Sequence, residues 1–160
     1  MLARLIPTAP PLLHLLTWAG HRCAGEAAYS SRVAPDGEVM IRLLLVDNNA
    51  QFLEVFARLL KQPPDMEVVA QAGSLAEARS KLSGVDVAIL DRGLPAGDGL
   101  ELISELREAS PGAAMLVMSA TVEQAHPHDA LEAGVDGILD KIITAPQEAI
   151  STIRQVATAG

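Results

Sequence analysis

From residue 41 onward, short aliphatic runs alternate with segments whose apolar residues recur at helical spacing. The runs are almost continuous in Leu, Ile, Val, Met and Ala, a pattern typical of strands that are buried on both faces of a sheet. They comprise residues 41–46, 66–72, 85–90, 113–119 and 136–140. Five strands that alternate with helices predict a (βα)5 fold of the α/β class, with a parallel sheet, right-handed crossovers and helices on both faces.

The segments between the runs have the features of amphipathic helices. Three of them have apolar stripes at helical spacing, which are Phe52, Phe56, Leu59 and Leu60, then Leu102, Ile103 and Leu106, and finally Ile150, Ile153 and Val156. Four helix starts are indicated by a Ser, Thr or Asp that precedes a Glu or Gln by three residues, as in a capping box. These pairs are Ser74–Glu77, Asp98–Glu101, Thr121–Gln124 and Thr144–Gln147.

Residues 1–39 differ in character from the rest of the chain. Their apolar stretch LIPTAPPLLHLL is broken by prolines and is shorter than the roughly 20 apolar residues that a membrane helix needs. The same prolines argue against a signal peptide, although Arg4 and the small residues near Ala24 would suit one. Met40 stands directly before the first aliphatic run. We therefore predict that Met40 is the natural start, that residues 1–39 are a loosely ordered extension, and that residues 40–160 form one domain.

The charge and the aromatic content limit the partners of such a domain. A net charge of -8 argues against electrostatic binding to nucleic acid, and an aromatic content of 2% leaves little surface for stacking bases. Cys23 is the one cysteine, so no disulfide can form within the chain, and a reducing compartment is the simpler interpretation. We predict a cytoplasmic domain that contacts neither nucleic acid nor membrane.

Chemically active side chains follow four of the predicted strands. Asp47 and Asp91 directly follow the first and third runs, Ser119 ends the fourth, and Lys141 follows the fifth. In an open parallel sheet, ligands bind beyond the carboxyl ends of the strands, near the point where the strand order reverses. Two carboxylates, a hydroxyl and an ammonium are therefore predicted to meet at one edge of the sheet.

Each of these residues also has a purely structural explanation. Asp47 or Asn48 would cap the next helix, and Asp91 would begin a turn that ends at Pro95. A hydroxyl at a strand end can satisfy a backbone group, and a lysine can be a solvated surface charge. Their joint position on the first, third, fourth and fifth strands nevertheless favours a shared site.

Residues 41–158 resemble the receiver domain of bacterial two-component response regulators. The resemblance rests on VDNNAQFLEVFARLL, ILDRGLPAGDGLELI, MSA and GVDGILDK, and the second is fairly specific because Asp-x-x-x-Pro-x-x-Asp-Gly begins with the family's phosphorylated aspartate. It implies a flavodoxin-like, doubly wound parallel sheet with strand order 2-1-3-4-5. The chain is similar to receivers that precede a helix-turn-helix output domain. After Ile153 only about two turns of helix could follow, so we expect no such domain here.

Carried over residue by residue, the resemblance implies an aspartyl-phosphate pocket. Asp91 would be the phosphoacceptor, whose carboxylate attacks a phosphohistidine of a sensor histidine kinase to form an acyl phosphate. Asp47 and Asp91, with the backbone carbonyl of Gly93, would hold Mg2+. Ser119 would donate a hydrogen bond to a phosphoryl oxygen, and Lys141 would pair with the phosphoryl group as a compact cation. Such a domain assists only its own phosphorylation and dephosphorylation, so we do not expect a turnover enzyme.

Asn48 departs from the family pattern, because it stands where a second metal-binding acid is usual. Its amide oxygen is a weaker ligand for Mg2+ than a carboxylate. The pocket formed by Asp47, Asp91 and Lys141 then carries about -1 instead of about -2. A phosphorylated Asp91 at about -2, together with Asp47, Lys141 and one Mg2+, would bring the sum to about zero. We predict weak Mg2+ binding in the free state and an electrically balanced phosphorylated state.

Other departures concern the last strand and the segment before it. Ile138 stands where many receivers have an aromatic switch residue, so coupling from Ser119 to this strand would be weak. Ile142 replaces the proline that usually follows the lysine, so we expect no cis peptide there. His126 and His128 could suggest a metal site, but without a cysteine or a third histidine nearby we interpret them as the polar start of the fourth helix.

The leading hypothesis is a phosphorylation-dependent switch of protein–protein contacts, with a possible homodimer through the fourth helix, fifth strand and fifth helix. The alternative is a degenerate pseudo-receiver, a protein-binding module that works without phosphorylation, which Asn48 and Ile138 favour. A small-molecule phosphatase with Asp91 as nucleophile is a third hypothesis, for which so short a chain offers no lid or substrate pocket.

Overall fold

A five-stranded parallel sheet organises the computed structural model, which describes residues 39–95, 97, 99–120, 134–142 and 144–159. The strand order is β2-β1-β3-β4-β5, so the predicted doubly wound α/β fold and its order 2-1-3-4-5 are confirmed. The strands are β1 (Ile41–Val46), β2 (Met66–Ala72), β3 (Val87–Asp91), β4 (Ala114–Ser119) and β5 (Gly137–Asp140). The helices are α1 (Ala50–Leu60), α2 (Leu75–Arg79), α3 (Leu102–Ala109) and α5 (Pro146–Thr158), with a short 3-10 turn at Gly99–Glu101.

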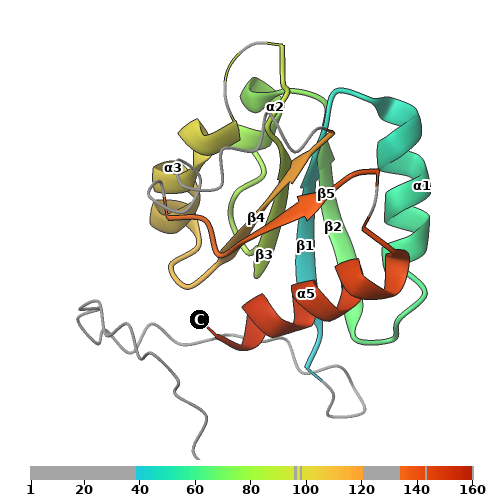
Figure 1. The fold of residues 1–160 in the computed structure, drawn as a ribbon. Coiled ribbons are helices and arrows are strands. Elements are labelled where there is room, and N and C mark those ends of the chain that lie inside the picture. Colours follow the sequence, from blue (N-terminus) through green and yellow to red (C-terminus); the bar gives the residue numbers. More distant parts are fainter. Residues whose placement is uncertain (1–38, 96, 98, 121–133, 143, 160) are drawn as a thin grey trace, which may run out of the picture.

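Helices cover both faces of the sheet (Figure 1). On one face α1 and α5 pack against side chains such as Leu43 and Leu45. On the other face α2 and α3 pack against the alternate side chains, such as Leu44 and Val46. Successive side chains of a strand point to opposite faces, so a strand covered on both sides has to be aliphatic at nearly every position. This explains the near-continuous apolar runs. Among the described residues, no helix has the length and apolar character that a membrane span requires.

The predicted apolar stripes of α3 and α5 are buried, whereas only Leu60 of the stripe predicted for α1 is buried. The buried face of α1 consists of Leu53, Ala57 and Leu60. Phe52 and Phe56 lie at the margin of this face, where they are half-buried and pack against the edge of the core. The two rings therefore lie between the core and the surface.

The cap of α1 differs from prediction, whereas the cap of α2 agrees with it. Asn49, rather than Asp47 or Asn48, caps α1, because its side-chain oxygen accepts hydrogen bonds from the N–H groups of Gln51 and Phe52, each at 3.1 Å. The N-cap of α2 is Ser74, as predicted, and its hydroxyl accepts from the N–H of Glu77 at 3.2 Å.

The predicted cap of α5 is wrong. The helix starts at Pro146 after Ala145, and the hydroxyl of Thr144 instead accepts a hydrogen bond from the N–H of Asp140 at 2.9 Å. Proline suits this first helical position because its missing N–H would be unpaired there in any case. The caps predicted at Asp98 and Thr121, the residues His126 and His128, the fourth helix and residues 1–38 all lie outside the described residues.

The amino-terminal edge of the sheet holds a partly buried ion pair, Arg42 with Asp86. Asp86, just before β3, accepts hydrogen bonds from the backbone N–H, Nε and Nη2 of Arg42, at 2.8, 2.9 and 2.7 Å. Nearby, Asp136 accepts from the N–H of Met115 at 2.8 Å. These carboxylates hold strand starts in register and are well supplied with donors, which gives them a structural role.

A surface ion pair joins α5 to the loop before β2, and its loss is expected to cost little. The Arg154 guanidinium donates to both carboxylate oxygens of Asp65, at 2.7 and 2.8 Å, and holds the pKa of Asp65 below its ordinary value of 3.8. Because the folded pKa is lower than the unfolded one, the contribution to stability is complete above the unfolded pKa and is lost as the pH falls through the folded pKa. Since Arg154 is 48% exposed, we expect Asp65→Asn to lower the free energy of unfolding by only about 0.2–1 kcal/mol near neutral pH.

Urea denaturation of Asp65→Asn and the unchanged protein, repeated at decreasing pH, measures this effect. The difference between the two should shrink towards zero in acid. A difference that stays constant with pH would contradict the assignment to this ion pair.

Candidate functional site

Asp47 sits at the carboxyl end of β1 and is completely buried. Its N–H donates to the carbonyl of Ala72 on β2 at 3.0 Å, which holds the residue at the strand edge. One carboxylate oxygen, Oδ1, accepts from the N–H of Asn49 at 2.8 Å. The other, Oδ2, pairs with the ammonium of Lys141, but no described residue offers it an aligned hydrogen-bond donor. Asp47 therefore turns one incompletely satisfied oxygen towards the middle of the edge.

Asp91 is the last residue of β3, and its carboxylate is held at both oxygens. Oδ1 accepts from the N–H of Gly93 at 3.0 Å, and Oδ2 lies 2.9 Å from Nζ of Lys141. The backbone beneath it is tightly packed, because a Cβ added to Gly99 would come within 2.9 Å of the carbonyl oxygen of Asp91. Gly99 thus allows the loop after β3 to pass close behind Asp91.

Lys141 joins the two carboxylates. Its ammonium pairs with Oδ2 of both Asp47 and Asp91, and its side chain is only 13% exposed. Its N–H donates to the carbonyl of Ser119 at 2.9 Å, so the lysine continues the pairing of β4 with β5. Two buried acids around one cation leave the pocket with a charge of about -1.

The remaining predicted site residues lie at the same edge, in different settings. Ser119 is buried at the end of β4, where it pairs in register with Asp140 of β5. The preceding residue, Met118, is the register partner of Asp91 on β3. Gly93 contributes its N–H to Asp91, and a Cβ there would meet only an ordinary contact at 3.6 Å, so no particular side chain is required. Asn48 is exposed beside Asp47.

Three nearby residues escaped prediction as parts of the site: Asn49, Gly99 and Phe52. Asn49 connects Asp47 to the start of α1, and Gly99 lies behind Asp91. The ring of Phe52 lies 4.8 Å, centroid to Nζ, from the ammonium of Lys141. A signal for Phe52 was present in the sequence, because Phe52 and Phe56 are the only aromatic residues after residue 40.

The oxygen atoms at this edge fit a small hard cation. Mg2+ prefers carboxylate and carbonyl oxygens, and the incompletely satisfied Oδ2 of Asp47 faces the Asp91 carboxylate across Lys141. Within the described ranges, no three His, Cys, Asp or Glu side chains cluster as a metal site would require. The charged oxygen donors at this edge are therefore two carboxylates, those of Asp47 and Asp91, which is a set of low charge.

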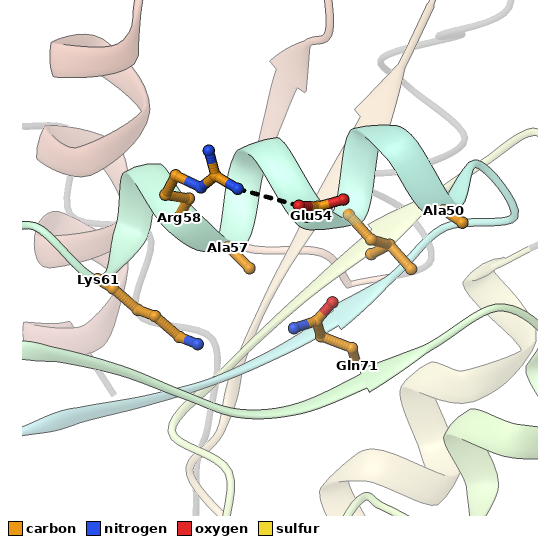
Figure 2. A pocket seen from close by; sticks show the side chains of 7 residues that line it. Ala50, Glu54, Ala57, Arg58, Lys61 and Gln71 are labelled. Carbon is orange, nitrogen blue, oxygen red and sulfur yellow. Dashed lines mark hydrogen bonds and ion pairs between the residues drawn. The ribbon is translucent and has the colours of Figure 1, made fainter.

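Two hollows lie near α1. One, of about 120 Å3, adjoins the site and is lined by residues of α1, β4, β5 and the start of α5, including Phe52, Phe56 and Lys141. The other, of about 390 Å3, is an open groove between α1 and β2, into which Lys61 and Gln71 point (Figure 2). The one acid in the lining of this groove, Glu54, is already paired with Arg58 at 3.0 Å. Of these two hollows, the smaller one touches the site.

Residues 43–154 match the family described as "Response regulator receiver domain". The transcriptional regulatory protein UhpA of Salmonella typhimurium is 40% identical over 123 residues, which cover 76% of this chain and 61% of that protein. The DNA-binding transcriptional activator DevR/DosR of Mycobacterium tuberculosis is 34% identical over 106 residues, which cover 65% of this chain and 49% of that protein. The chain thus spans less than two thirds of the length of these relatives.

Solved structures of response regulators are also similar to this chain in fold. A LuxR-family two-component response regulator from Aurantimonas superposes with a TM-score of 0.67 at 27% identity, over 75% of this chain and 86% of that one. CheY6 from R. sphaeroides, solved in complex with the P1 domain of CheA3, superposes with a TM-score of 0.60 at 30% identity, over 75% of this chain and 98% of that one.

Proposed function

The chain belongs to the family of response regulator receiver domains of two-component systems, and we propose that it accepts a phosphoryl group on Asp91 from a sensor histidine kinase, with Mg2+ as cofactor. Asp47 and Asp91 would hold the metal, together with the Gly93 carbonyl and, weakly, Asn48. Lys141 and Ser119 bind the incoming phosphoryl oxygens. The phosphorylated domain then changes its contacts with other proteins.

The observation that carries this proposal is the bridging position of Lys141. The ammonium of one lysine, whose side chain is 13% exposed, contacts the carboxylates at the ends of two neighbouring strands, β1 and β3. A structural ion pair needs one acid for one base, as Arg42 and Asp86 show at the opposite edge of the sheet. An additional buried acid raises the free energy of the folded state, and such costs are concentrated at functional sites.

The chemistry follows from the positions of these groups. A carboxylate oxygen of Asp91 attacks the phosphorus of a phosphohistidine, so an O–P bond forms as the P–N bond breaks. The leaving imidazole nitrogen keeps the bonding electron pair and takes up a proton. Charge in the transition state is spread over the three phosphoryl oxygens. The ammonium of Lys141, 2.9 Å from Asp91, and the hydroxyl of Ser119 are placed at the edge where that charge develops.

A bound Mg2+ would supply further neutralisation of the phosphoryl oxygens. The charges of the site favour the phosphorylated state, in which an acyl phosphate of about -2 with Asp47, Lys141 and the metal adds up to about zero. The unphosphorylated pocket carries less negative charge and therefore attracts Mg2+ more weakly than the phosphorylated one. Binding of the metal and of the phosphoryl group is therefore expected to be strongly cooperative in this chain.

The degenerate pseudo-receiver remains a second candidate function, and Asn48 is the observation that favours it. Asn48 is exposed and supplies no charge, so the site has one carboxylate fewer than the family usually has. If this deficit abolishes metal binding, the domain would act as a phosphorylation-independent protein-binding module. The two candidates differ in whether Asp91 can be modified at all.

We propose a phosphoryl donor, an output and a cellular compartment for the domain as well. The solved complex of CheY6 with a P1 domain supports a protein as the source of the phosphoryl group. We also propose that the domain acts through contacts with other proteins, including a homodimer through the fourth helix, β5 and α5. We place the domain in the cytoplasm.

Incubation with acetyl phosphate and Mg2+ tests the proposal. We expect the intact mass to rise by one phosphoryl group per chain, and we expect chelation of the metal with EDTA to prevent the rise. Acetyl phosphate serves as the donor because it does not require the unidentified kinase. An unchanged mass at high Mg2+ would contradict the proposal and favour the pseudo-receiver.

A further inference from the structure

We propose that Phe52 is a positioning residue for Lys141, holding the ammonium over the two carboxylates by a cation–π contact. The inference rests on the proposed function, since the reaction that it would affect is phosphoryl transfer to Asp91. Neither the family pattern carried over from the sequence nor the acidic residues of the site assign any role to this ring.

The contact itself has the geometry of a cation–π interaction. Nζ of Lys141 lies 4.8 Å from the centroid of the Phe52 ring, within the range of about 6 Å in which the ring quadrupole attracts a cation. The same ammonium contacts Asp47 and Asp91. Three neighbours, on α1, at the end of β1 and on β3, thus contact the ammonium of a side chain that is only 13% exposed, and partial removal from water strengthens the attraction to the ring.

A lysine at this position needs such an additional neighbour. Its side chain has four rotatable bonds, and its ammonium is strongly hydrated, so an extended conformation into solvent competes with the bridging one. Lys141 begins the loop after β5, beside the 75% exposed Ile142, where such an extended conformation is accessible. The ring of Phe52 covers the ammonium and favours the buried conformation.

Phe52 is itself held in place by the start of α1. Its N–H donates to the capping oxygen of Asn49 at 3.1 Å, and Asn49 in turn donates its own N–H to Asp47. On the other side, the Phe52 ring stacks on Phe56, with centroids 5.3 Å apart and planes inclined by 25°. One chain of contacts therefore fixes both the acid and the ring that face Lys141.

A purely structural role for Phe52 is less consistent with its position. The buried face of α1 is made by Leu53, Ala57 and Leu60, whereas Phe52 is half-buried and lines the small hollow beside Lys141. An aliphatic residue could cover the same margin of the core. Only an aromatic ring adds attraction for the ammonium.

The effect on phosphorylation is tested by comparing Phe52→Leu with Phe52→Tyr. Loss of a cation–π contact of this kind should slow phosphorylation by acetyl phosphate about fivefold in Phe52→Leu, whereas Phe52→Tyr retains the ring and should react like the unchanged protein. Val55→Ala, at a 69% exposed position of the same helix, is the control and should also be unchanged. Equal rates for Leu and Tyr at position 52 would overturn the proposal.

A second measurement detects the contact without any phosphorylation. The sequence has three lysines, Lys61, Lys81 and Lys141, so 13C-labelled lysine gives three ε-CH2 signals. We expect the Lys141 signal to show a ring-current shift that disappears in Phe52→Leu and persists in Phe52→Tyr, while the other two signals stay in place. A Lys141 signal that is the same in both variants would refute the contact.

The two measurements separate the inference from the function on which it rests. If the unchanged protein takes up no phosphoryl group, the proposed function fails, and the ring-current shift still decides whether Phe52 holds Lys141. If phosphorylation proceeds but no ring-current shift is found, the function stands and the role of Phe52 is wrong.

Discussion

Asp91→Asn is expected to abolish phosphoryl uptake completely and, at the same time, to raise the free energy of unfolding by about 1 kcal/mol. Uptake fails because the amide has no carboxylate oxygen with which to form an acyl phosphate. Stability rises because one of two buried carboxylates around a single ammonium is neutralised. The pocket then contains one acid, Asp47, and one base, Lys141.

Lys141→Met is the matched variant, and it is expected to change the free energy of unfolding in the opposite direction. It removes the ammonium but keeps much of the apolar side-chain volume, and it leaves Asp47 and Asp91 buried without a cation. Removal of one partner from a buried ion pair costs about 3–5 kcal/mol, so we expect a loss of stability in this range or somewhat below it. The stability should therefore increase in the order Lys141→Met, unchanged protein, Asp91→Asn.

Urea denaturation in the presence of EDTA measures this order, because the chelator removes any metal that would neutralise the acids. If Asp91→Asn were destabilised as strongly as Lys141→Met, the excess negative charge assigned to the pocket would be wrong. Loss of uptake in Asp91→Asn would in that case still identify the phosphoacceptor.

Asn48→Asp is expected to tighten Mg2+ binding to the unphosphorylated protein by at least tenfold, which corresponds to about 1.4 kcal/mol or more. The substitution adds a carboxylate ligand next to Asp47 and raises the negative charge of the pocket to about -2. Calorimetric titration with Mg2+ gives the dissociation constants of both proteins.

The neighbouring substitution Asn49→Asp provides a matched control. It introduces the same charge one residue away, but the side-chain oxygen of residue 49 is occupied with the N–H groups of Gln51 and Phe52. Aspartate also caps helices well, so the fold should be preserved. A Mg2+ affinity that is unchanged in Asn48→Asp, or that rises equally in Asn49→Asp, would refute the role given to position 48.

The sheet was predictable because burial on both faces leaves a direct signature in the sequence. The runs at residues 41–46 and 113–119 coincide with β1 and, to within one residue, with β4, since strands covered by helices on both sides admit few polar side chains. The convergence of Asp47, Asp91 and Lys141 followed from the same topology, because the carboxyl ends of parallel strands meet at one edge.

The errors arose where local patterns are ambiguous. Phe52 and Leu53 are adjacent and both apolar, so periodicity alone did not decide which of them faces the core. Three consecutive residues, Asp47, Asn48 and Asn49, can each cap a helix, and the choice depends on where β1 ends. The contact of Phe52 with Lys141 joins residues far apart in sequence, and only the fold brings them together.

The most direct test of the phosphoacceptor pocket is an NMR titration with beryllofluoride, a mimic of the phosphoryl group, in the presence and absence of Mg2+. We expect the amide signals of Gly93, Ser119 and Lys141 to shift together when both are added, far more than with either alone, and this joint shift to be absent in Asp91→Asn. Signals that do not respond to beryllofluoride and Mg2+ at high concentration would contradict a phosphoacceptor site at Asp91.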